Sequence, residues 1–116
     1  MAIDPISYLP LTEPTFYILL SLLPGKKHGY AILKDVKDLS GGRIQLSTST
    51  LYTAIGRLLD QDLIARFSDA EETVGSGFPR KSYALTGLGR RVLSAETGRM
   101  QVLVKEASLR LRGHAI

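Results

Sequence analysis

The chain contains no cysteine and no tryptophan. Without cysteine there is no disulfide framework, thiolate nucleophile or cysteine-based zinc site, which is consistent with a reducing cytoplasm. The longest apolar run, Phe16 to Leu23, is well short of the roughly 20 residues that a membrane-spanning helix needs. The acids Asp4 and Glu13 precede it, where a signal peptide would carry basic residues. We therefore predict a cytoplasmic protein with no membrane anchor.

The length of the chain limits the size of its core, and its net charge bears on the kind of partner it binds. With 116 residues, 44% of them hydrophobic, the chain can form one modest core. Its formal net charge of +4 and isoelectric point near 9.6 favour a polyanionic partner, but the excess is too small to decide without the placement of the charges.

Residues for catalysis or metal binding are scarce. His28 and His114 are far apart in the sequence, and no carboxylate stands near either at a ligand spacing. The stretch from Gly75 to Gly77 lacks the helix and lysine of a phosphate-binding loop. We expect no enzymatic activity, no cofactor and no metal site.

Three helices are predicted in the first half of the chain. Thr12 caps the first, whose body runs from Phe16 to Leu23, and the second spans about His28 to Leu39. The third begins at Ser47 to Thr50 and buries Leu51, Ile55, Leu58 and Leu59. Gly56 lies inside it at a cost of about 1 kcal/mol, which packing must offset.

The pattern then changes to that of a β-hairpin. Ile64 to Ser68 and Lys81 to Leu85 are predicted strands, joined by a long loop from Asp69 to Arg80 that contains Gly75, Gly77 and Pro79. Helices followed by a two-stranded ribbon indicate an α+β, mostly α, winged helix-turn-helix.

A long helix capped by Thr86 is predicted to end the chain. Residues at alternating spacings of four and three form an apolar seam along it: Leu93, Thr97, Met100, Val104, Ala107 and Leu111. The seam either packs back on the chain's own first helix or pairs with a second copy, and we favour the homodimer. The expected division is a winged-helix domain over residues 1–86 and a dimerisation helix over residues 87–116.

The third helix carries the candidate DNA-reading residues. Ser47, Thr48, Ser49 and Thr50 open it, and Tyr52, Thr53 and Arg57 lie off its apolar face. Short hydroxyl side chains and helix N-terminal amides can donate to phosphates and bases in a major groove. The alternative is that the four hydroxyl residues only cap the helix.

Arg80 and Lys81 close the predicted wing loop and are candidate ligands of phosphates or of a minor groove. The alternative is a solvated pair of charges, and the acids Asp69, Glu71 and Glu72 would be repelled by DNA. Five further basic residues could widen the surface: Lys26, Lys27, Arg43, Arg90 and Arg91.

Three blocks of sequence together resemble the PadR family of transcriptional regulators. They are residues 28–32 (His-Gly-Tyr-Ala-Ile), Thr50-Leu51-Tyr52 with Leu58-Leu59, and residues 80–86 (Arg-Lys-Ser-Tyr-Ala-Leu-Thr). The resemblance covers roughly residues 19–91. It implies a winged helix, a C-terminal dimerisation region and ligand-responsive repression, with the single terminal helix similar to the family's shorter subgroup.

Several positions depart from the family pattern. Thr53 replaces a usual proline, Asp62 replaces a glycine, and Gly87-Leu88 replace an acidic pair. Asp62 tolerates a left-handed backbone less well than glycine, so we expect a slightly strained turn there.

The resemblance also implies a small effector. An apolar gap between the terminal helices and the first helix could hold an aromatic ligand, lined by Tyr8, Phe16, Tyr17, Met100 and Val104, unless these residues only fill the core. The absence of tryptophan argues against the family variant that sandwiches flat drugs. We therefore predict a homodimeric repressor that binds a partly palindromic operator in double-stranded DNA. A protein-protein interaction module is the alternative.

Overall fold

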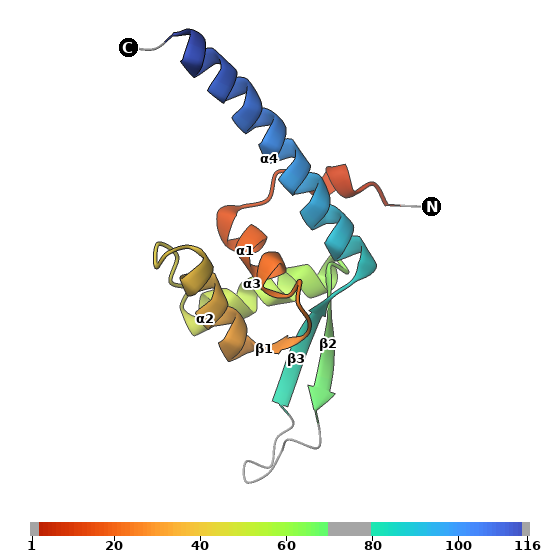
Figure 1. Ribbon diagram of the computed structural model, residues 1–116. Coiled ribbons are helices and arrows are strands. Elements are labelled where there is room, and N and C mark those ends of the chain that lie inside the picture. The colour runs from red at the N-terminus through yellow and green to blue at the C-terminus, as the bar shows by residue number, and fades with distance from the viewer. Residues whose placement is uncertain (1–2, 70–79, 115–116) are drawn as a thin grey trace.

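The computed structural model describes residues 3–69 and 80–114. The helices are η1, a short 3-10 helix (Pro5–Tyr8), α1 (Glu13–Ser21), α2 (Gly29–Leu39), α3 (Thr48–Asp60) and α4 (Gly87–Gly113); the strands are β1 (Lys27–His28), β2 (Ile64–Asp69) and β3 (Arg80–Leu85). Most of the predicted wing loop, with Glu71, Glu72, Gly75, Gly77 and Pro79, falls outside the described residues. In Figure 1, α1, α2 and α3 gather with the small sheet into one body, and α4 projects from it.

The helices begin where the sequence predicts, because the expected side chains cap them. The hydroxyl oxygen of Thr12 accepts the Thr15 N–H at 3.3 Å, and that of Ser47 accepts the Thr50 N–H at 3.1 Å. Thr86 begins α4 in the same way. Helix α1 ends at Ser21, two residues before the predicted Leu23.

The two predicted strands form the wing, which we define as β2 and β3. A third strand, which the sequence analysis did not identify, pairs antiparallel with β3, so that the sheet order is β1-β3-β2. In this strand Lys27 faces Tyr83 and His28 faces Ser82. Two residues are too few to show an alternating pattern. Strand β1 attaches the start of α2 to the middle of β3.

One core joins the three helices, the sheet and the first part of α4. Its buried apolar side chains are Ile18, Leu19, Leu22, Ile32, Val36, Leu51, Ile55, Leu58, Leu63, Ile64, Tyr83, Val92 and Leu93. The predicted apolar face of α3 is therefore correct at its centre, and α2 contributes Ile32 and Val36 to the same core. Leu33 and Leu59 are half-buried beside the core, and Leu39 is exposed.

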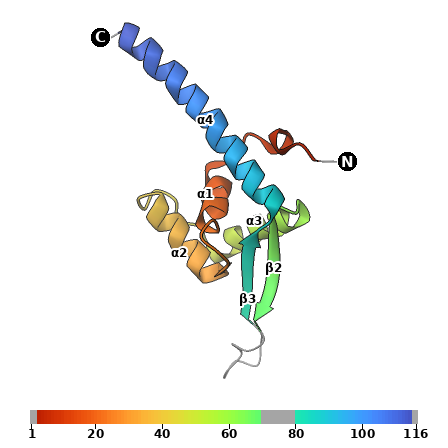
Figure 2. The same cartoon turned by 45° about the vertical axis from the view of Figure 1, so that its right-hand side comes forward.

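Helix α4 is packed at its start and uncovered beyond. Val92, Leu93 and Glu96 are buried, whereas every residue from 101 to 114 is exposed. Figures 1 and 2 agree that the second half points away from the body. Packing on the chain's own first helix thus accounts only for the beginning of α4. No helix within residues 3–69 and 80–114 is both long and apolar enough to cross a bilayer.

Glu96 fixes the start of α4 to the segment before α1. One carboxylate oxygen, Oε2, accepts the backbone N–H of Leu11 at 2.7 Å, and the other, Oε1, accepts Nε of Arg99 at 2.5 Å. The hydrogen bond from Arg99 lowers the pKa of Glu96 and outweighs the opposing effect of burial, with the Leu11 N–H lowering it further. The sequence analysis did not predict this buried carboxylate.

The turn between α3 and β2 has the expected backbone. Asp62 lies in the left-handed region with φ of 58°. The Thr86 hydroxyl donates to the Asp62 carbonyl oxygen at 2.6 Å, so the residue that caps α4 also holds this turn. Gly89 fits tightly behind it, because a Cβ there would lie 3.0 Å from the carbonyl carbon of Leu63.

Candidate nucleic-acid interface

The outward face of α3 carries the polar residues that the sequence analysis selected. Thr48, Ser49, Thr50, Tyr52 and Thr53 are all exposed. On the opposite side of the same helix the apolar residues Leu51, Ile55 and Leu58 are buried. The start of α3 therefore presents a surface of short hydroxyl side chains and one aromatic ring.

Some of these hydroxyl groups have structural roles within the helix. Ser47 is the N-cap, and its hydroxyl also donates to Oγ1 of Thr50 at 2.8 Å. The Thr53 hydroxyl donates to the Ser49 carbonyl oxygen at 2.9 Å. The capping interpretation thus applies to Ser47, while Thr48 and Ser49 stand on the first turn of the helix beyond the cap.

Tyr52 connects α3 to the start of α2. Its ring lies over Gly29, where an added Cβ would come within 2.9 Å of Cζ of Tyr52 and closer still to the hydroxyl oxygen. Gly29, Tyr52, Tyr30 and Thr48 border one small hollow between α2 and α3. The separate sequence blocks 28–32 and 50–52 are therefore one contact in space.

Tyr30 belongs to this surface, although the sequence analysis did not select it. It is the second residue of α2, and 78% of its surface is exposed. An aromatic side chain so exposed beside Thr48 and Tyr52 is placed to contact a partner of α3. Its position inside the block His28-Gly29-Tyr30 was the available signal.

The start of β3, at the loop end of the wing, lies beside the same region. Arg80 and Lys81 are exposed there. The Lys81 carbonyl oxygen is 3.1 Å from Nδ1 of His28, the residue before α2. Lys26 extends over the ring of Phe67 in β2, with Nζ 5.5 Å from the ring centroid. The starts of β3, α2 and α3 thus converge.

Tyr83 supports this convergence from the core. Its ring is buried in β3, and burial raises the pKa of its phenol; nearby Tyr52 raises it further, and Arg66 lowers it by a smaller amount. The phenol therefore remains neutral at ordinary pH, as a buried group should.

The remaining basic residues are divided by their surroundings. Lys27 pairs with Asp35, and Arg43 pairs with Glu13. Arg90 and Arg91 are exposed on the first turns of α4, which begins at the end of β3 opposite the wing loop. Lys27 and Arg43 are thus paired with acids of the chain itself, and Arg90 and Arg91 lie at the opposite end of β3 from Arg80 and Lys81.

Arg57 lies apart from the other selected residues of α3. It is exposed on the second half of the helix and borders a hollow of about 210 Å³ with Tyr8, Thr12, Thr15 and Gln61. That hollow separates α3 from the segment before α1. Arg57 can therefore reach the end of the α3 surface but not its centre.

The predicted seam of α4 divides into a buried and an exposed part. Leu93 is only 5% exposed and belongs to the core of its own chain. Met100 is half-buried, whereas Thr97, Val104, Ala107 and Leu111 are exposed. Val102, Leu103 and Leu109 add apolar surface that the seam does not include. The second half of α4 is thus apolar on more than one side.

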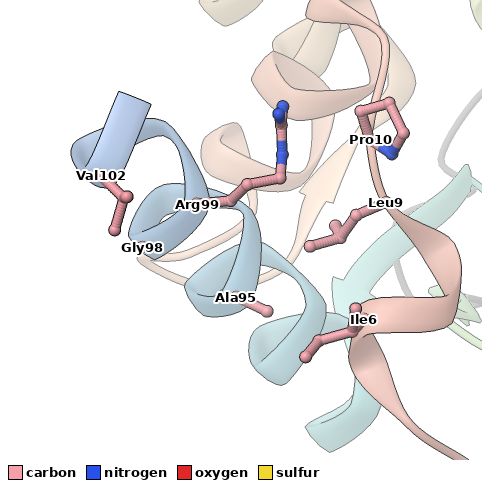
Figure 3. Close-up of a pocket in the computed structure, with 7 residues that line it drawn as sticks. All are labelled: Ile6, Leu9, Pro10, Ala95, Gly98, Arg99 and Val102. Atoms are coloured by element: carbon pink, nitrogen blue, oxygen red, sulfur yellow. The ribbon is translucent and has the colours of Figure 1, made fainter. Parts of the chain in front are cut away.

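The residues expected around an effector lie in different surroundings. Phe16 and Tyr17 are half-buried against the core, with ring centroids 6.0 Å apart, and Val104 is 63% exposed. Figure 3 shows a different, open hollow of about 450 Å³ between α4 and the segment before α1. Its lining residues are Ile6, Leu9, Pro10, Ala95, Gly98, Arg99 and Val102. The effector pocket stays a prediction.

No group of three histidine, aspartate or glutamate side chains that could hold a metal ion occurs in the described part of the chain. The described residues offer instead a polar helix face, an adjoining aromatic pair and a basic strand start. Three helices with a β-wing and this surface define a winged helix-turn-helix protein.

The chain belongs to the transcriptional regulator PadR-like family, whose model matches residues 18–95. The matched region contains all three sequence blocks and the first turns of α4. The resemblance stated from the sequence is therefore confirmed. A comparison with curated proteins found no match.

Solved structures agree with the family. The chain is similar to a PadR family transcriptional regulator from Eggerthella lenta DSM 2243, with 31% identity and a TM-score of 0.64, over 85% of this chain and 84% of that chain. A PadR family regulator from Clostridium difficile R20291 has 25% identity and a TM-score of 0.70, over 86% and 99%. Bacillus subtilis PadR, in complex with operator DNA, has 26% identity and a TM-score of 0.63, over 74% and 46%.

Proposed function

We propose that the protein is a DNA-binding transcriptional repressor that inserts α3 into the major groove of an operator. The observation that carries this proposal is the convergence of three segments, seen in the contact of Tyr52 with Gly29 and of His28 with the Lys81 carbonyl group. Together they carry exposed hydroxyl, aromatic and basic side chains. A related protein, Bacillus subtilis PadR, has been solved with operator DNA.

The proposed contacts divide by chemistry. Thr48, Ser49 and Thr53 on α3 would face base edges, while Arg80 and Lys81 would neutralise phosphates beside the groove. Ser47, Thr50, Tyr52 and Arg57 complete the proposed DNA surface, with Tyr30 added from α2.

We further propose that the active form is a homodimer joined through α4. Val104 and Leu111 are 63% and 70% exposed, and such an apolar surface is usually covered by a partner. Two-fold symmetry would place the two α3 helices about one DNA turn apart and favour a partly palindromic operator. Residues 87–116 would supply the dimerisation helix, with its first turns also part of the core.

Release by a small aromatic effector completes the proposed mechanism. Its binding between paired α4 helices would alter the spacing of the two α3 helices, and with it operator affinity. The protein would act by binding alone, without catalysis, in the cytoplasm where its DNA lies.

The proposal is tested by footprinting the protein on the DNA directly upstream of its own reading frame. A symmetric protected region with half-sites one helical turn apart is expected. A titration of that fragment and of random duplex at several salt concentrations should show specific binding and a steep salt dependence. Equal affinity for both duplexes at moderate salt would refute specific recognition. Absence of any binding at low salt would favour the protein-interaction alternative.

A further inference from the structure

Gly56 lies in the interior of α3, where glycine disfavours the helix more than any residue except proline. Packing was expected to explain it, since glycine is required where a side chain would collide with a neighbour. Yet a Cβ built on Gly56 meets no atom of the described residues within 4 Å. At Gly29 and Gly89, by contrast, an added Cβ would collide with neighbouring atoms. No contact within the described part of the chain therefore accounts for the glycine at residue 56.

The spacing of Gly56 from other residues of α3 shows which face of the helix it belongs to. It follows Ser49 by seven residues, Tyr52 by four and Thr53 by three, and these spacings share one face of an α-helix. All three residues are exposed. The buried residues Leu51 and Ile55 point to the other side. Gly56 thus belongs to the face that we have assigned to DNA.

Two kinds of partner could occupy this face, a second copy of the chain or a nucleic acid. The exposed apolar side chains suited to a second copy are concentrated on α4, at Val102, Leu103, Val104, Leu109 and Leu111. The exposed neighbours of Gly56 carry hydroxyl groups (Ser49, Thr53), a phenol (Tyr52), a guanidinium (Arg57) and, one turn further on, the carboxylate of Asp60. All of these except the carboxylate suit phosphates and base edges. The chemistry therefore favours duplex DNA.

We propose that Gly56 is the point at which the backbone of α3 comes closest to duplex DNA, lying against the sugar-phosphate wall of the major groove. This inference rests on the proposed function. A side chain at residue 56 would hold the helix away from the groove and lengthen the contacts made by Ser49 and Thr53. Gly56 is thus a positioning residue that sets the depth of α3.

Asp60 marks where this contact ends. It follows Gly56 by four residues on the same face and is exposed, so its negative charge would meet phosphate if α3 stayed close to the DNA. The helix must therefore diverge from the duplex beyond Gly56. Arg57, next in sequence, is then placed to reach a phosphate at that boundary.

The test compares Gly56→Ala and Gly56→Leu with the wild-type chain on the operator fragment found by footprinting. Gly56→Ala is expected to raise the melting temperature by about 4 °C, because alanine favours the helix. At the same time it should weaken operator binding at least tenfold, and Gly56→Leu should weaken it further. Ser94→Ala, at an exposed position of α4, is the matched control and should leave operator affinity unchanged.

Several results would overturn the proposal. Unchanged operator affinity of Gly56→Ala would do so while leaving the proposed function intact. A fall in melting temperature would mean that glycine has a role inside the protomer. Weakened binding that sedimentation traces to loss of the dimer would assign Gly56 to a contact between copies. If the wild-type chain bound no DNA, the proposed function would fail, and this inference with it.

Discussion

The ring of Tyr52 occupies the space in which a side chain at residue 29 would begin. The contact joins the start of α2 to the proposed DNA surface of α3, and its closeness leaves no room for a side chain at residue 29 unless Tyr52 moves. Tyr52 also lies near the buried Tyr83 of β3, whose phenol pKa is raised mainly by burial and to a smaller extent by Tyr52.

We predict that Gly29→Ala destabilises the protein by roughly 1–3 kcal/mol, because the added methyl group overpacks the site and displaces Tyr52. Thermal and urea unfolding measure this loss. Tyr52→Ala should remove most of the penalty, so that the double variant is more stable than the sum of the single changes predicts. If the stability changes of Gly29→Ala and Tyr52→Ala were strictly additive, a direct contact between the two positions would be contradicted.

Removal of the wing cations should affect all DNA alike. We expect Arg80→Ala with Lys81→Ala to reduce the slope of log affinity against log salt by about 2, one unit for each lost phosphate contact. Thr50→Ala or Tyr52→Ala should instead change the preference among operator variants. Binding titrations over a salt series make the comparison, and an unchanged slope in the double variant would exclude these residues as phosphate ligands.

The stability contributed by Glu96 should depend on pH. Its pKa is lowered in the folded state, chiefly by the hydrogen bond from Arg99, so the ionised carboxylate stabilises the fold above the ordinary glutamate pKa of about 4.3. This contribution disappears as the pH falls through the lower folded-state pKa. Glu96→Gln should cost roughly 1–3 kcal/mol at pH 7 and less near pH 3.

Urea unfolding at both pH values tests this prediction. Glu106→Gln, at an exposed acid of the same helix, is the control and should change stability little at either pH. An equal cost of Glu96→Gln at pH 7 and pH 3 would show that packing, not charge, makes Glu96 important.

The exposed half of α4 should control association. Val104→Glu is expected to weaken the dimer roughly 100-fold while the monomer remains folded, because it introduces a charge into the proposed apolar interface. The same change at Leu93 should unfold the chain, since Leu93 is buried in the core. Sedimentation with circular dichroism separates the two effects. Gln101→Glu, also exposed, is the control, and a dimer that tolerates Val104→Glu would refute this interface.

The sequence was most informative for features that depend only on residues close together in the chain. Thr12, Ser47 and Thr86 cap helices through bonds to backbone groups three residues away, so each signal is local and each was confirmed. Asp62 likewise shows the left-handed backbone expected of its turn.

Pairs distant in sequence could not be found in this way. Strand β1 exists only through its pairing with β3. Glu96 in a helical segment reads as a solvent-facing acid, and only its contact with Leu11, 85 residues earlier, reveals a buried anchor. The apolar seam of α4 has the same spacing along its whole length. Spacing alone therefore does not distinguish Leu93, which is buried in the core of its own chain, from Leu111, which is exposed.

The sequence alone determined the order of the longer helices and of the two hairpin strands, the winged-helix class and the family resemblance, because helix caps, apolar periodicity and short motifs each involve residues close together in the chain. The tertiary structure decided which of these elements meet. It brought Gly29 to Tyr52, the start of α2 to the middle of β3, and the first turns of α4 to the core. Burial and contact of this kind depend on residues that are far apart in the sequence.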